Sequence, residues 1–284
     1  MIEFTHDVQD LVDSQWNIDP TKFKPNMVIN GASEHYGNGM LEILASMLDN
    51  DSIVYSHNPD DHLRLPNLKF YPYWYHWMVE EFPDKHYKKH MSTDHCRYLM
   101  GCFNMSSHPH RILNWLHIRK LKNCVITMHN DEKFNGNNVI TLTPEEKNEW
   151  DQLKVNLSTP WLTSIHGPQE ANTDCYFNQV TETTICDRVF LTEKTWKPIA
   201  TGQLFVLLSN PGSIEHLRSV GIDCFDDIID HGYDLEPDPR KRIYQVWQSM
   251  DKLFKEDLYQ INKSTRDRRQ KNLDLFWSGK LYGV

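Results

Sequence analysis

The sequence lacks the signals of membrane, secreted and disulfide-stabilised proteins. No window approaches the roughly 18 uninterrupted apolar residues of a membrane span, and the first residues are polar and acidic, unlike a secretory signal. Six cysteines are irregularly spaced and form no C-x-x-C pair, so we expect reduced thiols instead of a zinc site or disulfides. We therefore expect a cytoplasmic protein without a membrane partner.

The motifs of common nucleotide-dependent and metal-dependent enzymes are also missing. Gly31, Gly37 and Gly39 do not make the G-x-G-x-x-G pattern of dinucleotide binding, and there is no P-loop and no G-x-S-x-G elbow. None of the 15 histidines falls in an H-E-x-x-H motif. The Asp49-Asn50-Asp51 triplet has the Asp-x-Asp spacing of metal-dependent transferases but is placed as a turn. We expect neither a metal nor a cofactor.

The charge balance is acidic, with 30 Lys and Arg against 39 Asp and Glu, which gives a net charge of −9. This argues against a protein that coats nucleic acid non-specifically, although it leaves room for a local basic groove. Two basic clusters, at 85–90 and 266–271, are candidates for such a groove. Each is equally readable as a solvated helix face.

The apolar pattern predicts an α/β protein. The apolar run 27–30, a glycine-rich loop, helical spacing over 40–48 and a second run at 52–55 indicate strand, loop, helix and strand. Further strands are predicted at 124–128, 176–180 and 204–208, and helices at 106–121, 192–201, 211–220 and 243–254. The uninterrupted run 204–208 is typical of a strand buried in a parallel sheet. Residues 56–100 are expected to form loops and short helices.

The segment Thr192-Glu193-Lys194 carries the clearest chemistry. Thr192 fits a helix N-cap, and the free N–H groups and positive dipole end of a first turn suit a diphosphate. Lys194 and Lys197 add positive charge there, and Glu193 can accept hydrogen bonds from ribose hydroxyls. Such an element would stabilise the negative charge on a departing nucleoside diphosphate. A surface helix with charges at i and i+3 is the alternative.

The same stretch resembles the donor half of fucosyltransferase-like enzymes of the two-Rossmann-domain (GT-B) type, and more closely phage-encoded members. Their E-K-T-x-K-P-I-x-x-G pattern matches residues 193–202, an apolar strand follows at 204–208, and G-x-x-x-x-L-x-x-x-G matches 212–221. An F-x-x-x-x-D-x-x-Y-D pattern matches 225–234, and a looser N-x-x-x-x-x-H-R element ends at Arg111. Thr-Glu-Thr stands where fucosyltransferases have Phe-Glu-Asn-Ser, which leaves the donor sugar open.

The resemblance implies an α/β, GT-B-like fold with two Rossmann-like halves facing a cleft. We expect an N-terminal arm at 1–25, an acceptor-side domain at 26–165, a donor domain at 166–262 and a C-terminal helix at 263–284 that returns to the first domain.

The resemblance also implies roles for individual residues. Glu193 and Lys194 contact the ribose and phosphate of the donor, and Glu182 lies near the donor sugar as a catalytic candidate. Arg188 is a candidate diphosphate clamp, with a structural ion pair as the alternative. The remaining donor-binding candidates are Thr192, Lys197 and Arg111. For an inverting reaction the base would be Glu34 or His35, whose alternative is an ordinary loop role.

The predicted function is that of a metal-independent glycosyltransferase with a nucleotide-sugar, such as a UDP-sugar, as co-substrate. The leading acceptor is 5-hydroxymethylcytosine in double-stranded phage DNA, or a sugar on it, which places the enzyme in the host cytoplasm. The basic clusters and the aromatic segment 71–77 could contact a flipped base. The alternatives are a polysaccharide or lipopolysaccharide glycosyltransferase and a non-catalytic binding module on a transferase fold.

Overall fold

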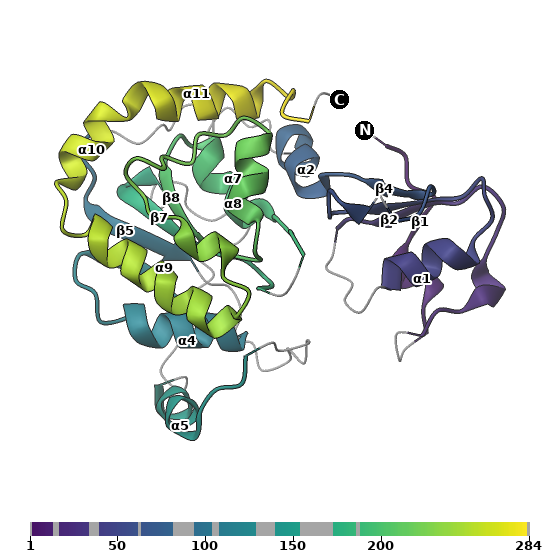
Figure 1. The fold of residues 1–284 in the computed structure, drawn as a ribbon, viewed down its shortest axis with the longest axis horizontal. Helices are drawn as coiled ribbons and strands as arrows, with labels where there is room; N and C mark the ends of the chain where they lie inside the picture. Colours follow the sequence, from purple (N-terminus) through teal and green to yellow (C-terminus); the bar gives the residue numbers. More distant parts are fainter. Residues whose placement is uncertain are drawn as a thin grey trace. The chain divides into compact units, whose positions relative to one another are not determined.

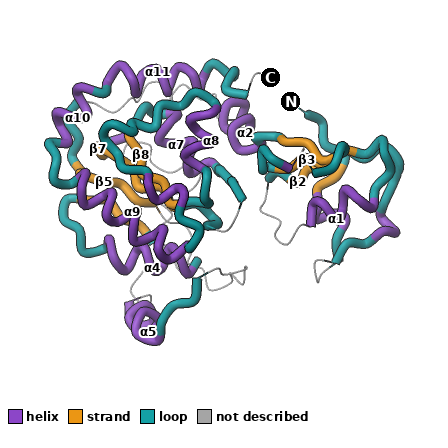
Figure 2. Tube along the Cα trace, viewed as in Figure 1, coloured by secondary structure: helices purple, strands orange, loops and turns teal. Residues whose placement is uncertain are grey.

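The computed structural model describes residues 2–13, 17–33, 40–61, 64–81, 94–103, 108–128, 140–153, 173–185 and 188–282. The chain divides into two compact units, Met1–Trp77 and Met78–Val284. Each unit holds a four-stranded sheet in which every pairing is parallel (Figures 1 and 2). The predicted α/β fold class is therefore confirmed. No helix of the described ranges is long and apolar enough to cross a membrane.

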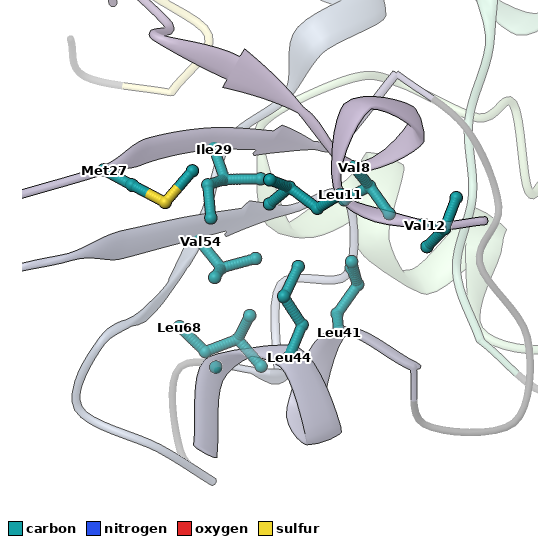
Figure 3. Close-up of a cluster of buried hydrophobic side chains, with 10 residues drawn as sticks. Val8, Leu11, Val12, Met27, Ile29, Leu41, Leu44, Val54 and Leu68 are labelled. Carbon is teal, nitrogen blue, oxygen red and sulfur yellow. The ribbon is translucent and has the colours of Figure 1, made fainter. Parts of the chain in front are cut away.

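The first unit is a sheet with strand order β1-β2-β3-β4. Its elements are β1 (His6–Asp7), η1 (Val8–Leu11), η2 (Pro20–Lys22), β2 (Val28–Gly31), α1 (Met40–Met47), β3 (Ile53–Ser56) and β4 (Leu68–Phe70), and α2 (Tyr73–Glu81) begins in this unit. Ile29 pairs with Val54 across β2 and β3. The apolar face of α1, with Leu41 and Leu44, packs over these strands and closes the core (Figure 3). The apolar residues of α1, which recur at helical spacing, thus face one side of the sheet, as the sequence predicts.

A glycine is required where β2 ends beneath α1. A Cβ atom on Gly31 would lie 2.6 Å from Leu41 Cδ2 and 2.7 Å from the backbone oxygen of Tyr55. Both distances are shorter than any ordinary carbon contact, so only glycine lets the strand approach its neighbours this closely.

The second unit is a parallel sheet with strand order β6-β5-β7-β8. Its strands are β5 (Tyr98–Phe103), β6 (Cys124–Thr127), β7 (Cys175–Thr181) and β8 (Leu204–Leu208). Its helices are α4 (Pro109–Ile118), α5 (Pro144–Leu153), α7 (Glu193–Ala200), α8 (Ser213–Ser219), η5 (Gly232–Leu235), α9 (Pro239–Leu253), α10 (Leu258–Ser264) and α11 (Arg266–Trp277).

The strand order of the second sheet creates a topological switch point between β5 and β7. Helix α4 leads outward from β5 to β6, and α7 leads in the opposite direction from β7 to β8. Right-handed crossovers that diverge in this way place their helices on opposite faces of the sheet. Accordingly, α4 lies beside α9, and α7 lies beside α11 (Figure 1). The carboxyl ends of two such strands are where open α/β sheets bind ligands.

The unit boundary differs from the expected domain boundaries. Strands β5 and β6 precede residue 165, yet β5 pairs directly with β7, so 26–165 is not one domain. Strand β5 begins within residues 56–100, where loops and short helices are expected, and it is not predicted from the sequence. The expected arm 1–25 contributes β1 to the first sheet and buries Val8 and Leu11 in its core. The C-terminal helix α11 packs on α7 of its own unit.

Two predicted helix starts also change. Helix α8 begins at Ser213, after Gly212, whose φ of 78° favours glycine, and not at the predicted residue 211. Helix α4 begins at Pro109 with His108 as its N-cap, whereas the predicted start at residue 106 lies outside the described residues.

Candidate functional site

The site is built around a carboxylate buried at the end of β7. Glu182 is 0% exposed. Its Oε1 accepts hydrogen bonds from the backbone N–H of Thr192 (2.9 Å) and from the hydroxyl of Thr195 (2.6 Å). Its Oε2 accepts from the hydroxyl of Thr192 (2.6 Å) and the backbone N–H of Thr183 (3.3 Å). Both oxygens are thus engaged by the start of α7, where the helix dipole favours a negative charge.

The first turn of α7 presents a lysine and a second carboxylate. Thr192 is the N-cap, as predicted, and its hydroxyl accepts from the backbone N–H of Lys194. Lys194 Nζ donates to Glu193 Oε1 (2.7 Å) and to the hydroxyls of Thr183 and Thr192 (both 3.2 Å). An ammonium group has three hydrogens, so all of them have an acceptor here. A ligand phosphate must therefore take the place of one of these three acceptors.

Helix α4 reaches the same place from β5. Arg111, which is 2% exposed, donates through Nη2 to the backbone oxygen of Thr181 (3.3 Å) and to the Thr183 hydroxyl (3.5 Å). His110 Nε2 donates to the backbone oxygen of Glu182 (2.9 Å), and because a carbonyl only accepts, the proton is on Nε2. Two helix starts thus meet at the switch point of the sheet.

The pKa values reflect a dry, positively biased environment. Burial would raise the pKa of Glu193, but Lys194 and Lys197 hold it below its usual value. Burial lowers the pKa of Lys197. Burial also brings the pKa of Arg111 to about 10, so the Arg111 guanidinium stays protonated at neutral pH. Burial beside Arg111 and Lys194 lowers the pKa of His108 to about 3, which leaves that imidazole neutral. Three basic residues, Arg111, Lys194 and Lys197, thus lie beside two acidic residues, Glu182 and Glu193.

The structure brings together most of the predicted donor-side residues. Arg111, Glu182, Thr192, Glu193 and Lys194 lie in this one cluster, and Lys197 follows one turn along α7. The loop that carries Arg188 runs beside it, and the Arg188 backbone oxygen accepts a hydrogen bond from Asn210 Nδ2. Glu34 and His35, the candidate bases, lie outside the described residues. The described ranges contain no group of three or more His, Cys, Asp or Glu that could hold a metal.

The features proposed for DNA contact have other partners where they are described. Arg268 is bound to Asp223 and Asp227, and Arg266 to Asp94. Arg269 is fully buried. Most of this cluster therefore makes intramolecular contacts, and the buried Arg269 does not fit the alternative of a solvated helix face. The first basic cluster, 85–90, lies outside the described residues.

The aromatic segment 71–77 also contributes to packing. Tyr75 is fully buried, Tyr71 stacks on His76, and the Trp74 indole donates to the backbone oxygen of Ser33. These rings have structural partners within the described part of the chain.

Sequence reasoning missed the residues that hold the site in place. Thr183 and Thr195 contact the charged groups directly. Arg242, which is 1% exposed, donates to the backbone oxygens of Ile185, Ser209, Glu236 and Pro237 and so ties together three loops at the carboxyl edge of the sheet. Neutral hydroxyls and a distant arginine carry no motif. The only sequence signals for the two threonines are the T-E-T run at 181–183 and the T-E-K-T run at 192–195.

Fold and site together define an α/β protein with a cationic cluster at the switch point of a parallel sheet. No protein-family model matches the chain, and no curated protein matches its sequence. Among solved structures, one similar chain is the DNA-modifying enzyme β-glucosyltransferase, studied with and without its substrate uridine diphosphoglucose. The identity is 11% and the TM-score 0.35, over 91% of this chain and 74% of that chain. A likeness at this level carries no functional argument.

Proposed function

We propose that the chain is a glycosyltransferase that binds the diphosphate of a nucleotide-sugar at the carboxyl edge of its second sheet. The observation that carries this proposal is the meeting of α4 and α7, which brings the guanidinium of Arg111 and the ammonium of Lys194 to the same hydroxyl, that of Thr183. Two cations beside helix starts at a switch point suit a diphosphate.

The proposed roles follow from what each group can exchange. Lys194 turns from Glu193 to the diphosphate, and Glu193 is then free to accept hydrogen bonds from the ribose hydroxyls. Arg111, Arg188 and Lys197 add positive charge that stabilises the departing nucleoside diphosphate without a metal. Glu182 has both oxygens engaged by α7 and is 0% exposed, so its proposed role is to position Thr192 and the first turn.

The first test is nucleotide binding. Titration calorimetry with uridine diphosphate and a panel of other nucleoside diphosphates is expected to show one preferred ligand for the wild type. Lys194→Met should weaken that affinity by about 100-fold, since a charge-assisted phosphate contact contributes about 2–3 kcal/mol. Lys241→Met is the matched control, because Lys241 is exposed on α9. Equal affinity in all three proteins would contradict the proposed site.

The proposed acceptor is the hydroxyl of 5-hydroxymethylcytosine in DNA, or of a sugar already attached to it, as the sequence resemblance implies. Glu34 or His35 is the proposed base that removes the acceptor proton. Mass spectrometry of nucleosides after incubation with hydroxymethylated DNA and nucleotide-sugars tests this directly. A gain of one sugar on the modified base supports the DNA acceptor. Nucleotide-sugar binding without that gain would move the acceptor to a glycan, and retained biological function in Lys194→Met would favour a non-catalytic module.

A further inference from the structure

Helix α7 is poorly equipped to hold its own position. It has eight residues, about 12 Å of helix at 1.5 Å per residue, and helices this short are marginal without tertiary contacts. Pro198 lies inside it and has no N–H to donate to the preceding turn. The orientation of its first turn therefore depends on contacts made at its two ends.

One end of α7 is fixed by Glu182, and the other is fixed by the C-terminal helix. Arg269 Nη1 donates to the backbone oxygen of Gly202 (2.8 Å), and the Trp277 indole Nε1 donates to that of Ala200 (2.9 Å). The last carbonyls of a helix have no partner within it, and a cation there complements the helix dipole. Buried charges of opposite sign thus sit at the two ends of the same short helix.

Arg269 is itself held firmly between helices. It is 0% exposed, and it also donates from Nη2 to the backbone oxygen of Asn262 (2.7 Å) and from Nε to the Thr265 hydroxyl (3.3 Å). Burial lowers its pKa to about 10, so it is charged at neutral pH. Farther along α11, the ring of Phe276 packs against that of Trp196, at 6.0 Å between centroids. Polar and apolar contacts therefore both join α11 to α7.

We propose that Arg269 and Trp277 are positioning residues for the nucleotide donor: they set the place of α7, and with it the place of Glu193 and Lys194. This inference rests on the proposed function. A packed helix moves as a unit, so a shift at Ala200 or Gly202 displaces the groups in its first turn. Displacements on the order of 1 Å are enough to weaken an oriented contact severely.

The experiment compares variants of the α11 residues that contact the C-terminal end of α7, and these variants leave every proposed donor contact intact. Trp277→Phe keeps an aromatic ring and removes only the N–H donor and part of the ring area. Arg269→Met removes the charge, and Arg269→Lys retains it. The matched control is Arg266→Ala on the same helix, because Arg266 is exposed and pairs with Asp94. Calorimetry with four nucleoside diphosphates (of uridine, guanosine, cytidine and adenosine) is run well below each melting temperature.

Trp277→Phe and Arg269→Met are expected to weaken the preferred nucleotide by about tenfold, about 1.4 kcal/mol. Arg269→Lys should recover most of this affinity, and Arg266→Ala should bind like the wild type. A lower melting temperature with unchanged nucleotide affinity would overturn the positioning role and leave a purely structural one. If Arg269→Met does not fold, Trp277→Phe decides alone. If the wild type binds none of the nucleotides, the proposed function falls and this inference falls with it.

Discussion

The two sheets are built from similar strands but differ in what they bury. Within the described ranges the first unit buries a single Asp, Glu, Lys or Arg side chain, that of Asp61. The second unit buries six, namely Arg111, Glu182, Glu193, Asp234, Arg242 and Arg269. The first sheet is closed by apolar packing around Ile29 and Val54, whereas the second holds its carboxyl edge with charges and backbone groups.

This difference means that the second unit bears more of the free-energy cost of burying charged groups than the first unit does. Taking a charge out of water is costly unless hydrogen bonds replace the lost hydration. Glu182 meets that condition with four hydrogen bonds and Arg242 with donors to four backbone oxygens. Such arrangements are costly as plain structural elements. Three of the six buried charged residues, Arg111, Glu182 and Glu193, lie at the start of α7, where the donor site is proposed.

The largest expected effect comes from removing the central carboxylate. Glu182→Ala leaves the Thr192 N–H and the Thr195 hydroxyl buried without their acceptor, and should lower the free energy of unfolding by about 3–5 kcal/mol. Nucleotide affinity should be lost in calorimetry at a temperature where the variant is folded. Asp61→Asn is the counterpart in the first unit, because Asp61 accepts from Ser56 and Asn58. It should destabilise the protein and leave nucleotide affinity unchanged; a parallel loss in both variants would mean that affinity merely follows stability.

A purely steric substitution in the first unit also tests the difference between the two units. Gly31→Ala places a methyl group 2.6 Å from Leu41 Cδ2 and 2.7 Å from the Tyr55 oxygen, which should cost about 1–3 kcal/mol of unfolding free energy. Hydrogen exchange should show faster opening in residues 28–56, with the second sheet and its nucleotide affinity unaffected. Loss of nucleotide affinity in this variant would assign part of the donor site to the first unit.

The Glu193–Lys194 ion pair allows a test in which one substitution changes the affinities for two ligands in opposite directions. Glu193→Gln removes the carboxylate that engages Lys194 Nζ, so inorganic pyrophosphate should bind about tenfold more tightly, about 1.4 kcal/mol. The same variant should bind a nucleoside diphosphate more weakly, because its ribose loses a charged acceptor. Lys194→Met should weaken both ligands. Equal weakening of both ligands by Glu193→Gln would show that this glutamate does not compete for the lysine.

The smallest effect per residue is expected for the loss of folding stability at acidic pH. Burial lowers the pKa of His108, His110, His117 and His231 in the second unit. The unfolded chain therefore binds protons before the folded one does, so stability is lost as the pH falls below the unfolded value near 6.5. For His108, whose folded pKa is about 3, this amounts to about 1 kcal/mol at pH 5.5.

Hydrogen exchange at pH 6.5 and pH 5.5 would measure this effect in each unit separately. The second unit should lose more protection than the first, and His108→Asn should reduce the loss. An equal loss of protection in both units, or no change in the variant, would contradict the assignment of the acid sensitivity to these buried histidines.

Much of the fold followed from local patterns. The apolar runs predict β2, β3, β6, β7 and β8 to within a residue or two, and helical spacing predicts α1, α7 and α9. Strand β5 was missed because Tyr98–Phe103 follows a histidine-rich and aromatic stretch that masks the strand pattern. That single omission moved the expected domain boundary, since β5 joins β6 to β7 in one sheet.

The sequence by itself determined the α/β class and the helix start at Thr192, Glu193 and Lys194, because an N-cap and its first turn are local features that a few adjacent residues specify. Only the tertiary structure decided what surrounds them. Arg111 approaches because β5 and β7 are neighbours, and Arg269 and Trp277 reach the other end of α7 because α11 packs beside it. Contacts between residues some 70 positions apart depend on strand order and helix packing, which no local pattern encodes.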